Sequence, residues 1–245
     1  MIRIKKPAKA PDKLSIEGKA EIECNNQLFE KGASVFAFKK NIYGHKSVKD
    51  SLKAAQHQKC CFCERKEEMG DIEHFRPKSH YYWLAYDWDN LFFCCPTCNR
   101  SYKKDLFPLF DESKRAYSHL DDISLEEPLF IHPEKSEPEK YIEYRGYKPH
   151  AINDNQKGLI TIQKTGLDRI FFSEDREQWY QMYKTIYESI EAFITLLKNG
   201  KIDSAMQQQF KNHLIKNQKK LEEAQKDNAQ YASMIRCAVK DKFRF

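Results

Sequence analysis

Two short cysteine motifs stand out because their spacing is typical of metal ligands. Two residues separate the members of each pair, and both pairs lie in one segment: Cys60 with Cys63, and Cys95 with Cys98. Thiolates are soft ligands, and four of them in a tetrahedral set suit Zn²⁺. The spacing therefore predicts a structural zinc ion held by these four side chains. We expect the adjacent Cys61 and Cys94 to be buried apolar residues.

The segment between the two pairs carries residues that could hydrolyse a phosphodiester. It contains Glu73 directly before His74, and Asn99 follows the second pair. A histidine with an ordinary pKa near 6.5 is a suitable general base at neutral pH. A hard cation such as Mg²⁺ or Mn²⁺ prefers oxygen ligands, which Glu73 and Asn99 supply. Asp71 would lie on the same face of a strand as Glu73 and is the alternative metal ligand.

Three basic residues near this acid–histidine pair are placed to meet phosphate. They are Arg76, Lys103 and Lys104. We expect all three to bind the backbone of a nucleic acid.

The order of these motifs resembles the HNH endonuclease family. An acid–histidine pair is followed by Asn90 before an apolar run, and then by Cys98-Asn99 at a helix start. The resemblance implies that His74 activates water and that Glu73 and Asn99 hold one divalent metal ion. It also implies that Asn90 braces the loop. Glu73 stands where aspartate is more usual, and Asn99 stands where a final histidine is common.

A narrower resemblance is to the retron-associated and Septu-type HNH endonucleases. It rests on four stretches, residues 72–78, 86–91, 95–99 and 107–109. This resemblance implies a role in anti-phage defence with a PtuA-like ABC-type ATPase as partner. A retron ribonucleoprotein is a further partner that it implies.

The remaining chain is expected to be mainly helical. We predict helices from Ser15 to about Lys31, from Ser47 to about Gln58, from Ser173 to near Gly200, and from Asp203 to about Val239. Residues 111–160 have short β-like runs and turn residues, which predict loops and one hairpin near residues 141–144.

These elements predict an α+β fold, mainly helical, with a small ββα-metal core flanked by N-terminal and long C-terminal helices. Along the chain we expect an N-terminal helical segment (1–54) and a nuclease core with the zinc knuckles (55–110). A loop-rich connection (111–172) and a C-terminal helical region (173–245) follow.

Composition sets wide limits on the partner and the compartment. The net charge is +6, and residues 201–245 hold ten Lys/Arg against five Asp/Glu, so a nucleic-acid or protein partner is compatible with the charge. The chain has no apolar run long enough for a membrane helix and no signal-like start, so we expect a cytoplasmic protein without a membrane partner.

The leading interpretation is a metal-dependent HNH endonuclease, with DNA favoured as its substrate. An RNA (tRNA) endonuclease of a retron-type system is the first alternative. The second is a zinc-knuckle module that binds nucleic acid or protein without cutting.

Overall fold

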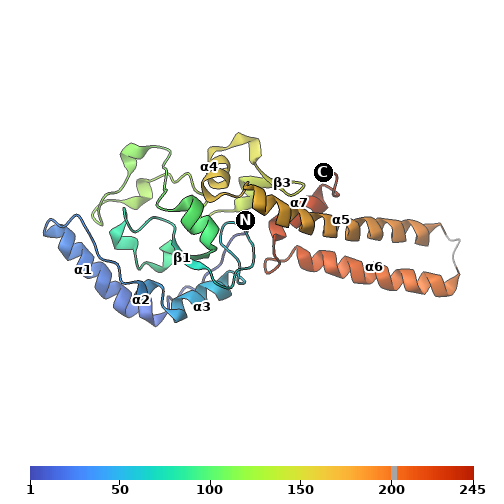
Figure 1. Ribbon diagram of the computed structural model, residues 1–245, viewed down its shortest axis with the longest axis horizontal. Coiled ribbons are helices and arrows are strands. Elements are labelled where there is room, and N and C mark those ends of the chain that lie inside the picture. Colours follow the sequence, from blue (N-terminus) through green and yellow to red (C-terminus); the bar gives the residue numbers. More distant parts are fainter. Residues whose placement is uncertain (200–202) are drawn as a thin grey trace. The chain divides into compact units, whose positions relative to one another are not determined.

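The chain divides into two compact units (Figure 1). The computed structural model describes residues 1–199 and 203–245, without the side chains of residues 171 and 172. Unit 1 contains residues 1–142 and 151–167, and unit 2 contains residues 143–150 and 168–245. The mainly helical α+β class predicted from the sequence is confirmed.

The centre of unit 1 is a two-stranded antiparallel hairpin, β1 (Asp71–His74) with β2 (Leu91–Cys94). Glu73 is opposite Phe92 and His74 is opposite Leu91. All four residues of β2 are buried, which explains its continuous apolar sequence. A short helix with π-type hydrogen bonding, η4 (Thr97–Lys103), follows β2. Together these elements form the expected ββα core.

Four helical elements precede the hairpin: η1 (Leu14–Gly18), α1 (Lys19–Glu30), α2 (Lys40–Tyr43) and α3 (Lys46–Ala55). Leu14 of η1, Ile42 of α2, and Val48 and Leu52 of α3 share one hydrophobic cluster with Leu91 and Phe93 of β2. The N-terminal helices therefore support the hairpin through buried apolar contacts, and they fix its place in unit 1.

Two predicted helix starts were wrong. Ser15 lies inside the first helical stretch, because the backbone N–H groups of Leu14 and Ser15 already bond to the carbonyl of Pro11. Ser47 is not the cap of α3 either. His45 precedes that helix and its Nδ1 accepts the N–H of Ser47, while Asp50 pairs with Lys46 at 2.5 Å.

One helix of unit 1 lies in the region expected to be loops. Helix α4 (Gln156–Thr165) begins after Asn155, whose side chain accepts the N–H of Gly158, and ends at Gly166 in the left-handed conformation. Position 166 also has no room for a side chain, since a Cβ would lie 2.5 Å from the ring of Tyr102 on η4. The close approach therefore joins the end of α4 to η4.

Unit 2 consists mainly of two long helices, α5 (Ile170–Lys198) and α6 (Ser204–Ala224), which run side by side (Figure 1). Phe193 packs on Phe210 with ring centroids 5.4 Å apart, and Asn217 donates a 2.7 Å hydrogen bond to Ser189. Asp203 caps α6 as predicted, because it accepts the N–H of Met206. The expected end of the preceding helix at Gly200 lies outside the described residues.

The prediction of one helix from Asp203 to Val239 was wrong. Helix α6 ends at Ala224, and after a turn a separate helix, α7 (Ala232–Lys240), follows. The predicted hairpin is present as β3 (Ile142–Arg145) and β4 (Lys148–Ala151), at the point where the chain passes between the two units. None of the helices described has the length and apolar character needed to cross a membrane.

Candidate metal centre and nuclease cleft

The two cysteine pairs meet at one buried point of unit 1. The ligand atoms of Cys60, Cys63, Cys95 and Cys98 all lie within 4.8 Å of one another. With Zn–S bonds of about 2.3 Å, sulfur atoms at the corners of a tetrahedron are about 3.8 Å apart. The Sγ atoms of Cys63 and Cys95 are 3.8 Å apart, and the N–H of Cys98 points at the sulfur of Cys95. The donor set and its spacing therefore fit a tetrahedral zinc ion.

Cys61 and Cys94 lie next to this cluster and form a second, smaller group with Cys60. The Sγ of Cys94 is 3.6 Å from that of Cys60. Burial raises the pKa of both Cys61 and Cys94 well above its ordinary value, which favours neutral thiols. This second group has three sulfurs rather than four, so the set predicted from the spacing is the more complete ligand set.

Glu73, His74 and Asn99 line one cleft of about 380 Å³ in unit 1. Strand β1 ends at His74 and the chain bends over residues 75–76. Adjacent strand residues normally point to opposite faces, yet all four residues of β1 line the cleft, so the cleft runs along this strand. Asn99 comes to the cleft from η4. The structure therefore brings together three side chains that the sequence placed in one site.

His74 is held in a defined tautomer. Its Nε2 lies 2.9 Å from the carbonyl oxygen of Ala85, and because a carbonyl only accepts, Nε2 must carry the proton. Burial lowers the pKa of His74 to about 3, and the nearby charge of Lys78 acts in the same direction. The ring is therefore neutral, with Nδ1 unprotonated and able to accept a proton from water.

Glu73 is buried against a lysine. The Nζ of Lys103 lies 2.5 Å from Oε1 of Glu73, and both side chains are at most 2% exposed. The ammonium group of Lys103 is therefore the close charged partner of Oε1. Lys103 also donates to the carbonyl of His74 at 3.0 Å. Burial raises the pKa of Glu73 and the charge of Lys103 opposes that shift.

Asp71, the alternative metal ligand, is already occupied by an arginine. Arg100 contacts both carboxylate oxygens of Asp71, at 2.7 Å through Nε and 2.5 Å through Nη2. The Arg100 side chain is 68% exposed, so this pair contributes little to stability. Glu73 is likewise paired, with Lys103, so ion pairing does not separate the two carboxylates as ligands for a divalent ion.

Asn90 ties the chain segments around the cleft together. Its Oδ1 accepts the N–H of Arg76 at 2.7 Å, and its Nδ2 donates to the carbonyls of Arg76 and Leu84 at 2.9 and 3.0 Å. The residue is buried. These three hydrogen bonds link β2 to the bend after β1, which fits the bracing role implied by the family resemblance.

Replacing Asn90 with alanine is expected to lower the free energy of unfolding by about 2–4 kcal/mol, since three backbone groups in buried or partly buried hydrogen bonds would lose their partner. Urea unfolding followed by circular dichroism measures this change. The exposed Asn41 provides an Asn→Ala control and should shift stability by no more than about 0.5 kcal/mol. Equal, small effects of both substitutions would contradict a bracing role.

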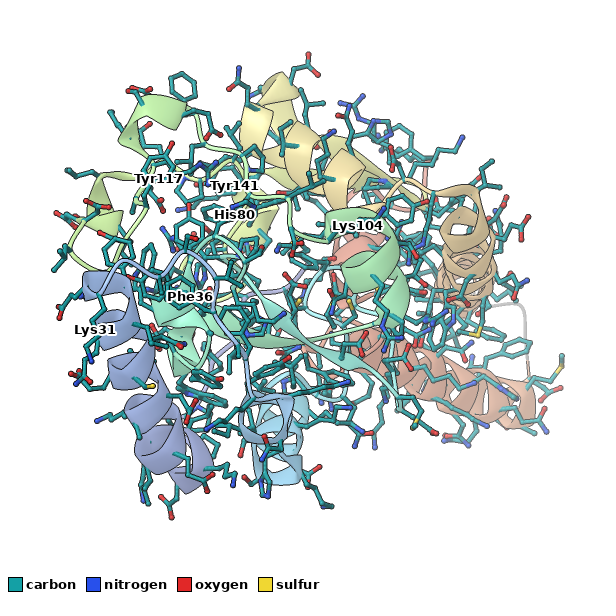
Figure 2. All side chains as sticks on the ribbon, turned by 60° about the vertical axis from the view of Figure 1, so that its left-hand side comes forward. Lys31, Phe36, His80, Lys104, Tyr117 and Tyr141 are labelled. Atoms are coloured by element: carbon teal, nitrogen blue, oxygen red, sulfur yellow. The ribbon has the colours of Figure 1, made fainter. Side chains whose placement is uncertain are left out.

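The three expected phosphate ligands lie in three different places. Lys104 follows the last residue of η4 and lines the cleft (Figure 2). Lys103 is fully buried beneath Glu73, and no phosphate could reach it there. Arg76 faces away from the cleft, because its guanidinium pairs with the buried Glu126 at 2.8 Å. The arrangement therefore keeps Lys104 at the cleft and does not bring Lys103 or Arg76 to it.

Cationic side chains other than Lys103 and Arg76 line the cleft. Lys40 of α2, Lys49 of α3 and Lys78 of the bend line the cleft with Arg100. Sequence reasoning assigned no role to them, although Lys78 lies within the motif that carries the family resemblance. The lysines of α2 and α3 carry no local signal, because only the folding of these helices beside β1 brings them near His74.

Comparison with known proteins agrees with this geometry. The profile of the HNH endonuclease family matches residues 60–105, which span both cysteine pairs, the hairpin and η4. The chain therefore contains an HNH endonuclease domain.

Two curated relatives refine this class. Septu protein PtuB of Bacillus mycoides (strain KBAB4) is 34% identical over 151 residues, which cover 55% of this chain and 51% of the relative. Septu protein PtuB of Bacillus thuringiensis is 26% identical over 222 residues, which cover 88% of this chain and 72% of the relative. The match to the first relative thus spans about half of that relative's length. The chain is thus similar to Septu-type PtuB proteins, and its residues 60–105 match the HNH endonuclease family.

Proposed function

We propose that this chain is a metal-dependent endonuclease that hydrolyses phosphodiester bonds of DNA in a Septu-type anti-phage system. The observation that carries the proposal is the neutral His74, whose free Nδ1 shares a cleft with an acid, an amide and several cations. In this arrangement a water molecule gives its proton to Nδ1 as its oxygen attacks phosphorus. One phosphorus–oxygen ester bond breaks as the new one forms.

Glu73 and Asn99 would hold a Mg²⁺ or Mn²⁺ ion at this cleft. Their carbonyl and carboxylate oxygens are suitable donors, and both residues line the same cleft. When bound, such an ion would neutralise charge on the phosphate and on the leaving oxygen. Zn²⁺ at Cys60, Cys63, Cys95 and Cys98 would have a structural role.

We further propose a PtuA-like ABC-type ATPase as partner, from the similarity to the two Septu proteins. Both matched relatives are Septu proteins, so the proposal does not include the retron ribonucleoprotein. The cleft cations would contact phosphate, which DNA and RNA share. Phosphate contacts do not distinguish the two polymers, so both are tested, DNA first and tRNA second.

A cleavage assay with plasmid DNA and total tRNA tests this function. Wild type and His74→Ala are incubated with Mg²⁺ or Mn²⁺, each with and without the ATPase. We expect metal-dependent products that His74→Ala reduces by about 10²- to 10⁴-fold, since general base catalysis contributes that much. The exposed His80, which does not line the cleft, provides a His→Ala control (Figure 2).

His80→Ala should cut as wild type does. Equal cleavage by wild type and His74→Ala would contradict the role of His74. If no condition gives products from a folded, zinc-containing protein, the chain is a binding module rather than an enzyme.

A further inference from the structure

Lys78 occupies the wall of the cleft nearest the end of β1. It follows His74 by four residues and lines the same cleft as Glu73, His74 and Asn99. Its side chain is partly buried rather than extended into solvent. Because the side chain is partly buried, water solvates its ammonium group only in part, and neighbouring groups of the protein also contact it.

Aromatic rings hold the Lys78 ammonium group. Its Nζ lies 5.7 Å from the ring centroid of Tyr43 and 5.9 Å from that of Phe38. Tyr43 also packs edge-on against His74, with centroids 4.9 Å apart. Ring faces attract a cation without neutralising it. The same tyrosine therefore orients both the cation and the proposed base.

Lys78 also has no carboxylate ion pair with any residue in the described part of the chain. By contrast, Arg100 at the same cleft is paired with Asp71, and Lys103 beneath it is paired with Glu73. Lys40 and Lys104 line the cleft but are exposed. Lys78 is thus a partly buried cation of the cleft whose contacts in the described residues are with aromatic rings.

The charge of Lys78 acts on both reacting groups of the site. It lowers the pKa of His74 and opposes the rise in the pKa of Glu73. This effect requires the ammonium group to lie close to both side chains, which agrees with the contacts to Tyr43 and with the shared cleft.

We propose that Lys78 is a further catalytic residue, which binds a non-bridging oxygen of the phosphate that is cleaved. This inference rests on the proposed nuclease function. Lys78 keeps its proton throughout, while the water gives its proton to His74. As water attacks phosphorus and one ester bond breaks, negative charge grows on the non-bridging oxygens, and Lys78 donates a charge-assisted hydrogen bond to one of them.

The test separates the rate of cutting from the binding of the polymer. Single-turnover cleavage of a DNA duplex, or of tRNA if that is the polymer cut, is measured for wild type, Lys78→Gln, Lys78→Arg and Lys104→Gln. We expect Lys78→Gln to lower the rate at saturating enzyme by about 10²-fold, as the loss of one pre-organised donor does. Lys78→Arg should recover part of this loss. Lys104→Gln should mainly raise the concentration needed for half-maximal rate.

Lys46→Gln is the matched control for net charge, because Lys46 is 86% exposed and lies outside the cleft. It should leave rate and binding unchanged. Fluorescence anisotropy with the same labelled nucleic acid in the His74→Ala background then gives affinities without cutting. There Lys78→Gln should weaken binding only a few-fold.

Three outcomes would overturn the inference. A saturating rate that Lys78→Gln leaves unchanged would remove the catalytic role while the nuclease function stands. Loss confined to affinity, equal to that of Lys104→Gln, would make Lys78 an ordinary backbone contact. If wild type cuts neither polymer, the catalytic role falls with the proposed function, and anisotropy alone decides whether Lys78 binds phosphate.

Discussion

Replacing Cys98 with serine is expected to unfold unit 1 and to release zinc. The four sulfurs are buried within 4.8 Å of one another, and removal of one sulfur leaves Zn²⁺ with an incomplete tetrahedral ligand set. Structural zinc contributes about 10–16 kcal/mol in small zinc domains, which is comparable with the whole stability of a typical domain. Metal analysis together with thermal unfolding followed by circular dichroism measures both effects. A chelator such as EDTA should reproduce them in the wild type.

Two further cysteines provide controls for this prediction. Cys24 is exposed, so Cys24→Ser should keep both zinc and the melting temperature. Cys94 lies beside the four expected ligands, and Cys94→Ser should keep the zinc while losing some stability. Loss of zinc from Cys94→Ser, with retention by Cys98→Ser, would assign the ion to the smaller group of Cys60, Cys61 and Cys94.

Replacing Lys103 with methionine is expected to lower the free energy of unfolding by about 3–5 kcal/mol. Methionine has nearly the length of lysine but no charge, so Glu73 would remain as a buried carboxylate without a partner. Breaking a buried ion pair from one side is costly for this reason, whereas removing both charges is often nearly neutral. The double variant Lys103→Met/Glu73→Gln should therefore regain most of the lost stability.

Urea unfolding of the two single variants and the double variant gives the coupling energy directly. The neighbouring Lys104→Met is the control, because Lys104 is exposed, and it should change stability by about 0.5 kcal/mol at most. Additive effects in the double variant would mean that Lys103 and Glu73 do not form the pair described.

The cluster of four cysteines and the order of the HNH motif could be predicted because both depend on short-range spacing. Two residues between cysteines are typical of metal ligands and bring the two sulfurs of a pair close together. The brace was predictable from resemblance only, since the three partners of Asn90 are backbone groups that no side-chain pattern reveals.

The two adjacent lysines at the end of η4, Lys103 and Lys104, could not be told apart from the sequence. Lys103 is the last residue of a helix with π-type bonding, which changes the usual helical spacing, and Lys104 takes a positive φ of 49° that ends it. The sequence pattern therefore does not distinguish the buried Lys103 from the exposed Lys104. Arg76 was misplaced for a different reason: its partner Glu126 lies 50 residues away.

Helix α4 was missed although its signals are present, with Asn155 before it and Gly166 after it. Pro and acidic residues nearby favoured loops. The end of α6 at Ala224 had a weaker signal, the Asp227-Asn228 pair, because these residues favour turns but do not force one.

The cleft has one rigid wall and one adaptable wall. Cys98 and Asn99 are consecutive, so only one peptide unit of about 3.8 Å separates a buried sulfur ligand from a residue of the cleft. No loop lies between these two residues, so an inserted residue would displace either Cys98 or Asn99. Lys40 and Lys49 also line the cleft, but they belong to short helices joined by a loop, where lengthening is tolerated. Divergence in substrate range among homologues is therefore expected to concentrate on α2 and α3.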